Sequence, residues 1–270
     1  MKFKTDFFRR YIAIAPLPLA TERSWECEVQ SAQEFMHPIL DIGCGDGIFA
    51  RNLVDETGEK IDVGIDPNAR EIDRAEQFDF YDELIVCYGD NIPKEDGSFN
   101  TIFSNSVMEH IPKIEPVLQE AHRLLSESGK MYLTLPTDKF DRYSLMSRLL
   151  ESVGLKGAAA KWRQFYNSFW AHYHYYPRGE WEAMFARNGL KIVDSFEYAS
   201  KGQCLFNDMM NPLCFFAFIV KKVTNRWFIF PLLRRVVSQL LHVPLFSRVA
   251  KLKKQPKGQG GLIFFALQKL

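Results

Sequence analysis

The sequence is poor in the features that mark metal-binding and secreted proteins. Its 270 residues include only five cysteines, none in a CxxC pair and none beside a histidine at the short spacing that zinc sites use. We therefore expect no structural zinc. An odd number of scattered cysteines is typical of reduced thiols, so we expect a cytoplasmic protein. The basic, aromatic N-terminus leads to no convincing cleavage site, and we predict no signal peptide.

Long hydrophobic runs are also missing. The two strongest, residues 212–220 and 227–233, are nine and seven residues long, whereas a membrane-spanning helix needs roughly 20 apolar residues. A transmembrane helix is therefore not expected. What the chain does have is 47% hydrophobic and 25% charged residues, the balance of an ordinary folded protein. Its length suits one large α/β domain carrying an insertion.

Strand and helix signals alternate between residues 39 and 137 at the spacing of βαβ units. Strands are predicted over 38–42, 60–65, 84–88, 99–104 and 130–135, with helices over 47–56, 68–77 and 114–125 and a turn at Ser128-Gly129. Beyond residue 136 we predict a helical stretch to about 170, a helix over 178–188, and strands over 191–198 and 261–269. The pattern predicts a Rossmann-like, doubly wound α/β fold with a seven-stranded, mostly parallel sheet and an antiparallel last strand. Ligands of such sheets bind at the carboxyl ends of the strands.

A helical, apolar insertion interrupts this pattern between the last two strands. The expected division is a main domain of residues 1–200 plus 261–270, with 1–37 as a helical cover, and an insertion of residues 201–260. The insertion holds eleven Lys and Arg and one acid, a net +10, so the rest of the chain is acidic. A basic, apolar segment of this kind favours an anionic surface. We interpret residues 204–250 as a membrane-surface segment, a lid over an apolar acceptor pocket, or a homodimer interface.

Three alternating glycines follow the first strand in the segment Asp41-Ile-Gly43-Cys-Gly45-Asp-Gly47. Without Cβ atoms the backbone can approach a ligand closely, and the helix that follows offers unpaired N–H groups. The spacing differs from the GxGxxG of dinucleotide-binding loops. Asp41 would repel a pyrophosphate, and it favours a ligand with a cationic amino end.

This loop resembles motif I of the class I S-adenosylmethionine-dependent methyltransferases, and residues 39–137 resemble the type 11 subfamily. The segment 96–112 is similar to the subfamily's strand-four signature, and 123–129 to its later arginine, leucine and glycine element. The resemblance implies S-adenosylmethionine as cofactor, with Asp66 accepting from the ribose hydroxyls and Asp90 from the adenine amine. Cys44 is then a small loop residue rather than a nucleophile. The implied cofactor-binding residues are Asp41, Gly43, Cys44, Gly45, Gly47, Asp66, Pro67, Asp90, Asn91, Ser104 and Asn105.

His110 is the candidate general base, because it follows the fourth strand near the expected methyl group and imidazole titrates in the useful range. A structural role, in which His110 caps the following turn, stays open. Related quinone O-methyltransferases carry a Glu-x-x-Glu-His metal cluster here, but this chain has Ser106 at the first position, so we expect no metal. The residues around Asn105 lack the Asp/Asn-Pro-Pro-aromatic motif of nucleobase enzymes, and nucleic acid is not an expected partner.

The alternating segment 172–177 offers His172, His174 and Tyr175 as candidate substrate contacts, with both histidines on one side; ordinary aromatic packing is the alternative. Together these features predict an enzyme that methylates a small or lipid-linked acceptor, at oxygen, in the cytoplasm or at the inner face of the membrane. The alternative is a non-catalytic protein that binds S-adenosylmethionine and serves as a scaffold.

Overall fold

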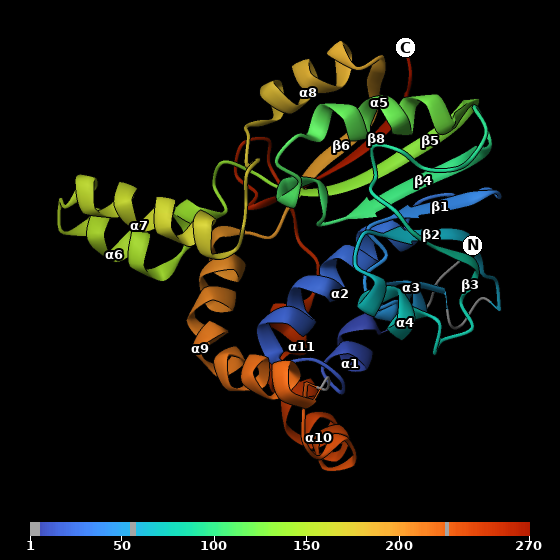
Figure 1. Ribbon diagram of the computed structural model, residues 1–270. Helices are drawn as coiled ribbons and strands as arrows, with labels where there is room; N and C mark the ends of the chain where they lie inside the picture. Colours follow the sequence, from blue (N-terminus) through green and yellow to red (C-terminus); the bar gives the residue numbers. More distant parts are fainter. Residues whose placement is uncertain (1–5, 55–57, 225–226) are drawn as a thin grey trace.

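A single eight-stranded sheet organises the protein, in the order β3-β2-β1-β4-β5-β8-β6-β7 (Figure 1). The computed structural model describes residues 6–54, 58–224 and 227–270, without the side chains of residues 213, 215, 216 and 218. The parallel strands are β1 (Ile39–Ile42), β2 (Ile61–Asp66), β3 (Tyr81–Val86), β4 (Phe99–Asn105) and β5 (Leu125–Pro136). Antiparallel β8 (Leu262–Lys269) lies between β5 and β6 (Leu190–Tyr198). The predicted fold class is confirmed, and β7 (Lys254–Gln255) adds a two-residue eighth strand.

Helices cover both faces of the sheet. One face carries α5 (Ile114–Leu124) and α8 (Arg178–Arg187), whose buried side chains share a core with β1, β4 and β5. The other face carries α2 (Leu17–Ser31), α3 (Ile48–Val54) and α4 (Ala69–Ala75). The helix predicted over 47–56 is α3, and residues 55 and 56 lie outside the described ranges. Two apolar cores thus hold the strand ends in fixed positions.

The turn predicted at Ser128-Gly129 is wrong. Helix α5 ends at Leu124 and β5 begins at once, so both residues lie inside the strand. The pairing with β4 jumps from Phe99–Leu125 to Thr101–Lys130, and the small residues fall in this irregular stretch. The Ser126 hydroxyl donates to Asn100 Oδ1 there, at 2.7 Å. Serine and glycine are common in turns, but here they lie in a bulge of β5.

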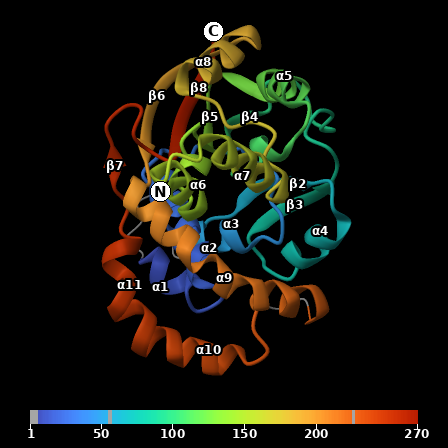
Figure 2. The same cartoon turned by 90° about the vertical axis from the view of Figure 1, so that its left-hand side faces the viewer.

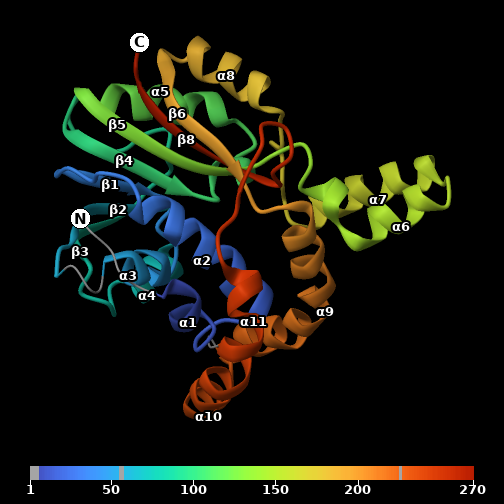
Figure 3. The ribbon, with the colours of Figure 1, turned by 180° about the vertical axis from the view of Figure 1, so that it is seen from behind.

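A helical layer lies beyond the second face of the sheet. It is built from α1 (Phe7–Tyr11), α2 and the insertion, which comprises α9 (Lys201–Thr224), α10 (Pro231–Val237), the π-helical turn η3 (Ser238–His242) and α11 (Val243–Ala250). In Figures 1 and 3, α1 and α2 lie between the sheet and these insertion helices. Contacts of α9 with α2 and of α11 with α1 close the layer.

A separate hairpin of α6 (Leu145–Ser152) and α7 (Lys156–Phe169) follows β5 and the short turn η2 (Asp141–Tyr143). Figure 2 shows this hairpin facing the viewer, with α9 running below it. Within the described ranges, no helix combines the length and the apolar character needed to cross a bilayer. Several apolar side chains of α10 and η3 are nevertheless largely exposed, including Leu232 at 80% and Leu240 at 70%.

Candidate active site

The glycine loop between β1 and α3 is pressed against the end of β2. The backbone N–H groups of Gly43 and Cys44 both donate to the Ile65 carbonyl at 2.9 Å. Gly43 has a φ of +82°, and a Cβ there would lie 2.5 Å from Val107, in the chain that follows β4. By contrast, nothing lies within 4 Å of the Cβ position of Gly45. Gly43 therefore permits close packing of the loop against the segment after β4, and Gly45 presents an open backbone to a ligand.

Asp66 ends β2 directly beside this loop. Its Oδ2 accepts the Gly45 N–H at 3.1 Å and its Oδ1 accepts the Asn68 N–H at 2.8 Å. A carboxylate has about four acceptor sites, so each oxygen keeps room for a ligand hydroxyl. Asp66 thus holds the loop in place and is available to the ribose that the resemblance implies. Pro67 is exposed beside it.

Asp90 and Asn91 follow the end of β3 at Val86 by several residues, and both are exposed. The third strand spans Tyr81–Val86 rather than the predicted 84–88, so the chain leaves the sheet two residues earlier than expected. Neither side chain lines a described cavity of the free protein. Their role at the adenine edge stays a prediction.

Asp41 is buried behind the loop instead of facing a cavity. Its Oδ2 accepts the hydroxyl proton of Tyr81 at 2.7 Å, and burial raises the pKa of Asp41 to about 7. Burial also raises the pKa of the Cys44 thiol far above its ordinary value. A thiol held in its protonated form is a poor nucleophile, in line with a packing role for Cys44. Asp41 is therefore held by Tyr81, and its role in cofactor binding stays a prediction.

A cavity of about 380 Å³ lies over the glycine loop, and one of the implied cofactor-binding residues, Gly45, lines it. Its floor includes Gly45 and Asp46. Its cover comes from the insertion, where Lys221 Nζ lies 3.6 Å from Asp46 Oδ2 and 4.5 Å from the ring centroid of Trp227. The end of α9 thus reaches the glycine loop at Asp46. A lid over an apolar acceptor pocket stays a prediction.

Helix α2 supplies charged side chains that no sequence motif indicated. Glu26 is fully buried at the end of β4, where its carboxylate accepts from Asn105 Nδ2 at 2.6 Å and from the Ser106 hydroxyl at 2.5 Å. Arg23 donates to the same carboxylate at 2.6 Å. Ser106 has a φ of +50°, an uncommon conformation for a non-glycine residue. Ser104 lies just before it, fully buried, with its hydroxyl donating to the Ile42 carbonyl. The network fixes the strand end on which the acceptor must be placed.

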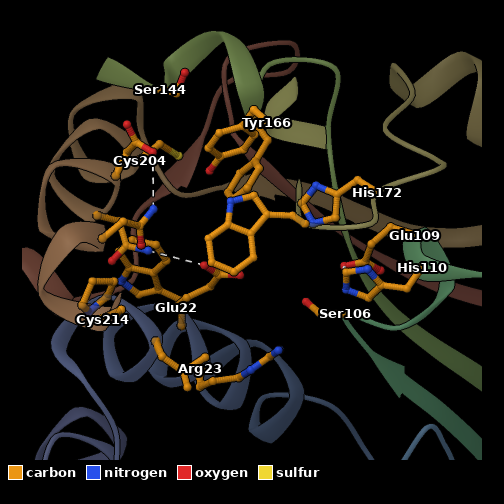
Figure 4. A pocket seen from close by; sticks show the side chains of 18 residues that line it. Glu22, Arg23, Ser106, Glu109, His110, Ser144, Tyr166, His172, Cys204 and Cys214 are labelled. Carbon is orange, nitrogen blue, oxygen red and sulfur yellow. Dashed lines mark hydrogen bonds and ion pairs between the residues drawn. The ribbon is translucent and has the colours of Figure 1, made fainter. Parts of the chain in front are cut away.

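Next to this network lies a second cavity of about 140 Å³ (Figure 4). His110, Glu109 and Ser106 come from the segment after β4, and His172 comes from the chain after α7. In Figure 4 these four side chains lie on one side of the cavity, and Glu22, Cys204 and Cys214 lie on the opposite side. Leu19, Arg23 and Trp170 line both this cavity and the one over the glycine loop. The two cavities therefore share a wall.

His110 and His172 face each other with ring centroids 5.2 Å apart. Burial lowers the pKa of His110, and burial together with His110 lowers the pKa of His172 to about 4. Both imidazoles are thus neutral at pH 7. Burial raises the pKa of neighbouring Glu109 to about 8, so its carboxyl group is protonated there. Glu109 Oε2 and His172 Nδ1 are buried with no hydrogen-bond partner among the described residues.

Glu109, His110 and His172 could also hold a metal ion, since one ligand atom from each lies within 4.8 Å of the others. Two imidazoles and one carboxylate form a set that zinc or iron accepts. A metal would have to displace the proton of Glu109, which weakens binding at neutral pH. The sequence of residues 106–110 alone does not predict this ligand set, because His172 belongs to the segment that follows α7. A site without a metal stays a prediction.

The other two candidate substrate residues lie elsewhere. His174 is buried, with Nδ1 2.9 Å from the Tyr176 hydroxyl and Nε2 2.9 Å from the Ile111 carbonyl. Tyr175 lines a different cavity, beside Asp141. The expectation that both histidines point the same way is therefore wrong, since only His172 reaches the cavity of His110. His174 instead fixes the chain that follows α7 to the segment after β4.

Comparisons with known proteins agree with this geometry. Residues 18–195 match the family model described as a methyltransferase domain. A sterol 24-C-methyltransferase of Gibberella zeae is 33% identical over 118 residues, covering 41% of this chain and 31% of that protein. A sarcosine/dimethylglycine N-methyltransferase of Halorhodospira halochloris is 31% identical over 109 residues, covering 38% of this chain and 39% of that protein. The chain thus spans well under half the length of these relatives.

The fold is shared over the whole chain with a solved methyltransferase. The structure described as a possible histamine N-methyltransferase of Thermotoga maritima has a TM-score of 0.56 and 14% identity, with 97% of this chain and 91% of that chain covered. Strand order and the glycine loop at the end of β1 define a class I methyltransferase fold. Because the matched segment exceeds half of the chain, the protein belongs to the methyltransferase-domain family, whose cofactor is S-adenosylmethionine.

Replacing Asp66 by alanine is expected to weaken S-adenosylmethionine binding by about 1–3 kcal/mol. The ribose hydroxyls would lose a charged acceptor, and the glycine loop would lose the bond from Gly45. Isothermal calorimetry measures the effect. Asp73→Ala on α4, outside the loop, is the matched control and should bind the cofactor as the unaltered protein does. An unchanged affinity in Asp66→Ala would remove Asp66 from the cofactor site.

Proposed function

We propose that this protein transfers the methyl group of S-adenosylmethionine to an oxygen atom of a small or lipid-linked acceptor. The observation that carries the proposal is the pair of neutral imidazoles, His110 and His172, in a cavity that shares a wall with the cavity over the glycine loop. The two relatives named above act, by their names, on carbon and on nitrogen. The proposal of an oxygen acceptor therefore rests on the candidate base His110 and not on the relatives.

Bound S-adenosylmethionine supplies a methyl group already activated by a sulfonium, so the protein chiefly holds the acceptor in line and excludes water. His110 Nδ1 lies 3.2 Å from the Ala171 carbonyl, which can only accept. Nδ1 therefore carries the ring proton in the tautomer we assign, and Nε2 presents a lone pair. Bound S-adenosylmethionine would supply the methyl group to the acceptor oxygen and would leave as S-adenosylhomocysteine, and His110 Nε2 would take the hydroxyl proton.

A paired polar network borders the cavity beside His110, which we call the acceptor cavity. The half-buried Arg23 guanidinium and the half-buried Ser106 hydroxyl both donate to the buried Glu26 carboxylate. A positioned base contributes typically 10²- to 10⁴-fold to a rate, and that gain depends on its geometry. The network supports a positioning role for α2, which the sequence analysis treated only as a cover.

We further propose that α10, η3 and α11 rest on an anionic membrane surface, which places the protein in the cytoplasm and peripherally at the inner face of the membrane. The insertion's net +10 charge and the exposed leucines Leu232, Leu240 and Leu245 support this position. Lys221 at the end of α9 covers the cofactor cavity instead. The same insertion then serves as a lid in one half and as a surface segment in the other.

A methyl-transfer assay on extracted small molecules and lipids tests the main proposal. With S-adenosylmethionine labelled in its methyl group and EDTA present, we expect a labelled product whose methyl group sits on oxygen, as mass spectrometry can show. Calorimetry should report cofactor binding in parallel. Cofactor binding without transfer to any extract would favour the scaffold alternative. Transfer that stops with EDTA and returns with a divalent ion would assign the Glu109 cluster to a metal.

A further inference from the structure

An apolar groove lies between the α6–α7 hairpin and the first half of α9. Figure 2 shows how these helices are placed. Its volume is about 400 Å³. The walls are mainly aromatic and aliphatic, with Trp162, Phe165 and Phe169 from α7, Leu145 from α6 and Met209 from α9. Phe165 packs 5.5 Å from Trp162 and 6.1 Å from Phe169, centroid to centroid, in a row along the helix.

These side chains are exposed to an extent that calls for a covering ligand. Phe169 is 65% exposed, Phe165 is 56% exposed and Met209 is 48% exposed. Contiguous apolar surface of this kind marks a binding site more often than a free surface. Asp208, a polar residue of the lining, is already paired, since its Oδ2 accepts the Leu145 N–H at 2.8 Å and its Oδ1 accepts from Asn211 Nδ2 at 3.3 Å. The groove therefore offers a ligand apolar contact and little else.

The groove adjoins the acceptor cavity. Tyr166, Trp170, Asp208 and Asn211 line both, so these side chains form a shared wall. The acceptor cavity measures about 140 Å³. An engineered protein cavity of about 150 Å³ holds one benzene molecule, so the space beside His110 admits a group of about ring size. A larger acceptor has to extend beyond that cavity, and the groove is the apolar space next to it.

We propose that this groove binds the hydrocarbon tail of the acceptor, so that the acceptor is an amphiphile with a ring-sized polar head and a single apolar chain. This inference rests on the proposed function, because the head is the group that reaches His110. The four lining residues shared with the acceptor cavity favour a tail over a second copy of the protein or a membrane lipid. The tail lies along α7 and the head lies between His110 and Arg23.

A series of 4-alkylphenols with two to eight chain carbons tests the inference, because each compound combines a ring-sized hydroxyl head with a tail of known length. Binding is measured by calorimetry in the presence of S-adenosylhomocysteine, below the micelle concentration. We expect the affinity to rise about fourfold for each added methylene until the groove is filled. This factor corresponds to the free energy of about 0.8 kcal/mol for burying one methylene group. An affinity that is independent of chain length would overturn the proposal.

Variants of the groove give the matched comparison. Phe165→Asn, on α7, should weaken octylphenol binding tenfold or more and leave ethylphenol unchanged. Met209→Gln, on the opposite wall, should act in the same direction if Phe165→Asn fails to fold. Phe230→Asn makes the same chemical change at a residue that is 68% exposed outside the groove, and it should change neither affinity. Equal losses in Phe165→Asn and Phe230→Asn would contradict the assignment.

Two further readouts separate this inference from the proposed function. Chain-dependent binding without methyl transfer to the phenols would keep the groove and reject the oxygen acceptor. Methyl transfer to short and long phenols at equal efficiency would keep the enzyme and reject the tail site. If Phe165→Asn converts a dimer into a monomer in analytical ultracentrifugation, the groove belongs to a second copy of the chain and the inference fails.

Discussion

Replacing His110 by alanine is expected to reduce methyl transfer by about 100-fold or more while leaving S-adenosylmethionine affinity nearly unchanged. The imidazole lies in the acceptor cavity and not over the glycine loop, so its loss removes the proton acceptor but no cofactor contact. Labelled methyl transfer measures the first effect and calorimetry the second. A variant that transfers at the rate of the unaltered protein would return His110 to the structural role of capping a turn.

The pH dependence gives this prediction a signature that a structural role would not produce. Burial lowers the pKa of His110 from its ordinary value of 6.5, so the unprotonated base is complete at neutral pH and is lost only in acid. The rate should therefore rise with pH through a value below 6.5 and then level off. The rate of His110→Gln should not show this rise with pH. Added imidazole should restore part of the rate of His110→Ala. His37→Ala, a matched control that removes a histidine paired with Asp62 ahead of β1, should keep both rate and profile.

Anionic liposomes are expected to carry the protein upward in a flotation gradient at low salt and to release it as salt is added. Each basic residue near an anionic surface contributes about 1 kcal/mol, so three engaged cations change the affinity by roughly 100-fold. The release follows because the Debye length falls to about 8 Å at physiological ionic strength. Exposed leucines on α10 and η3 supply apolar contact that salt does not remove.

The informative variant is the triple charge reversal Lys222→Glu, Arg235→Glu and Arg248→Glu, at three exposed positions of the insertion. Lys221 and Arg234 are unsuitable, because Lys221 covers Asp46 and Arg234 donates to the Ala15 carbonyl at 3.2 Å. The reversal should abolish flotation and preserve transfer to a soluble acceptor. Reversal of exposed Lys156, Lys161 and Lys191, outside the insertion, changes the net charge equally and should leave flotation intact. Absence of flotation by the unaltered protein at low salt would reject the membrane position.

The position of the glycine loop beside Asp66 was predictable because both sit at strand ends. A parallel sheet brings the ends of β1 and β2 to one edge, and the Gly45 N–H donates to Asp66 there. Local spacing was sufficient for this contact, and the roles of these residues toward the cofactor stay predictions. Local spacing did not predict that the Asp41 side chain is buried against Tyr81. It also did not predict the start of β5, because bulges and turns use the same residue types.

The acceptor side was less predictable because it depends on contacts between distant segments. Asn105 binds Glu26 across 79 positions, and the His110–Ala171 bond spans 61. Neither α2 nor α7 carries a sequence motif that predicts a hydrogen bond to the segment after β4. The similar histidines His172 and His174 show the limit well, since one faces the cavity and the other is buried against Tyr176. Their sequence context is nearly identical, and only the packing of the chain after α7 separates them.

Trp170 lines the cavity over the glycine loop, the acceptor cavity and the apolar groove alike. A rotation of this one indole changes the shape of all three spaces together. Ligands that require different positions of the ring consequently alter each other's affinity, and the factor is the same in both directions by thermodynamic linkage. An acceptor that tightens cofactor binding is itself held more tightly once the cofactor is bound. The order in which cofactor and acceptor bind depends on rates, whereas the coupling free energy between them is the same for either order.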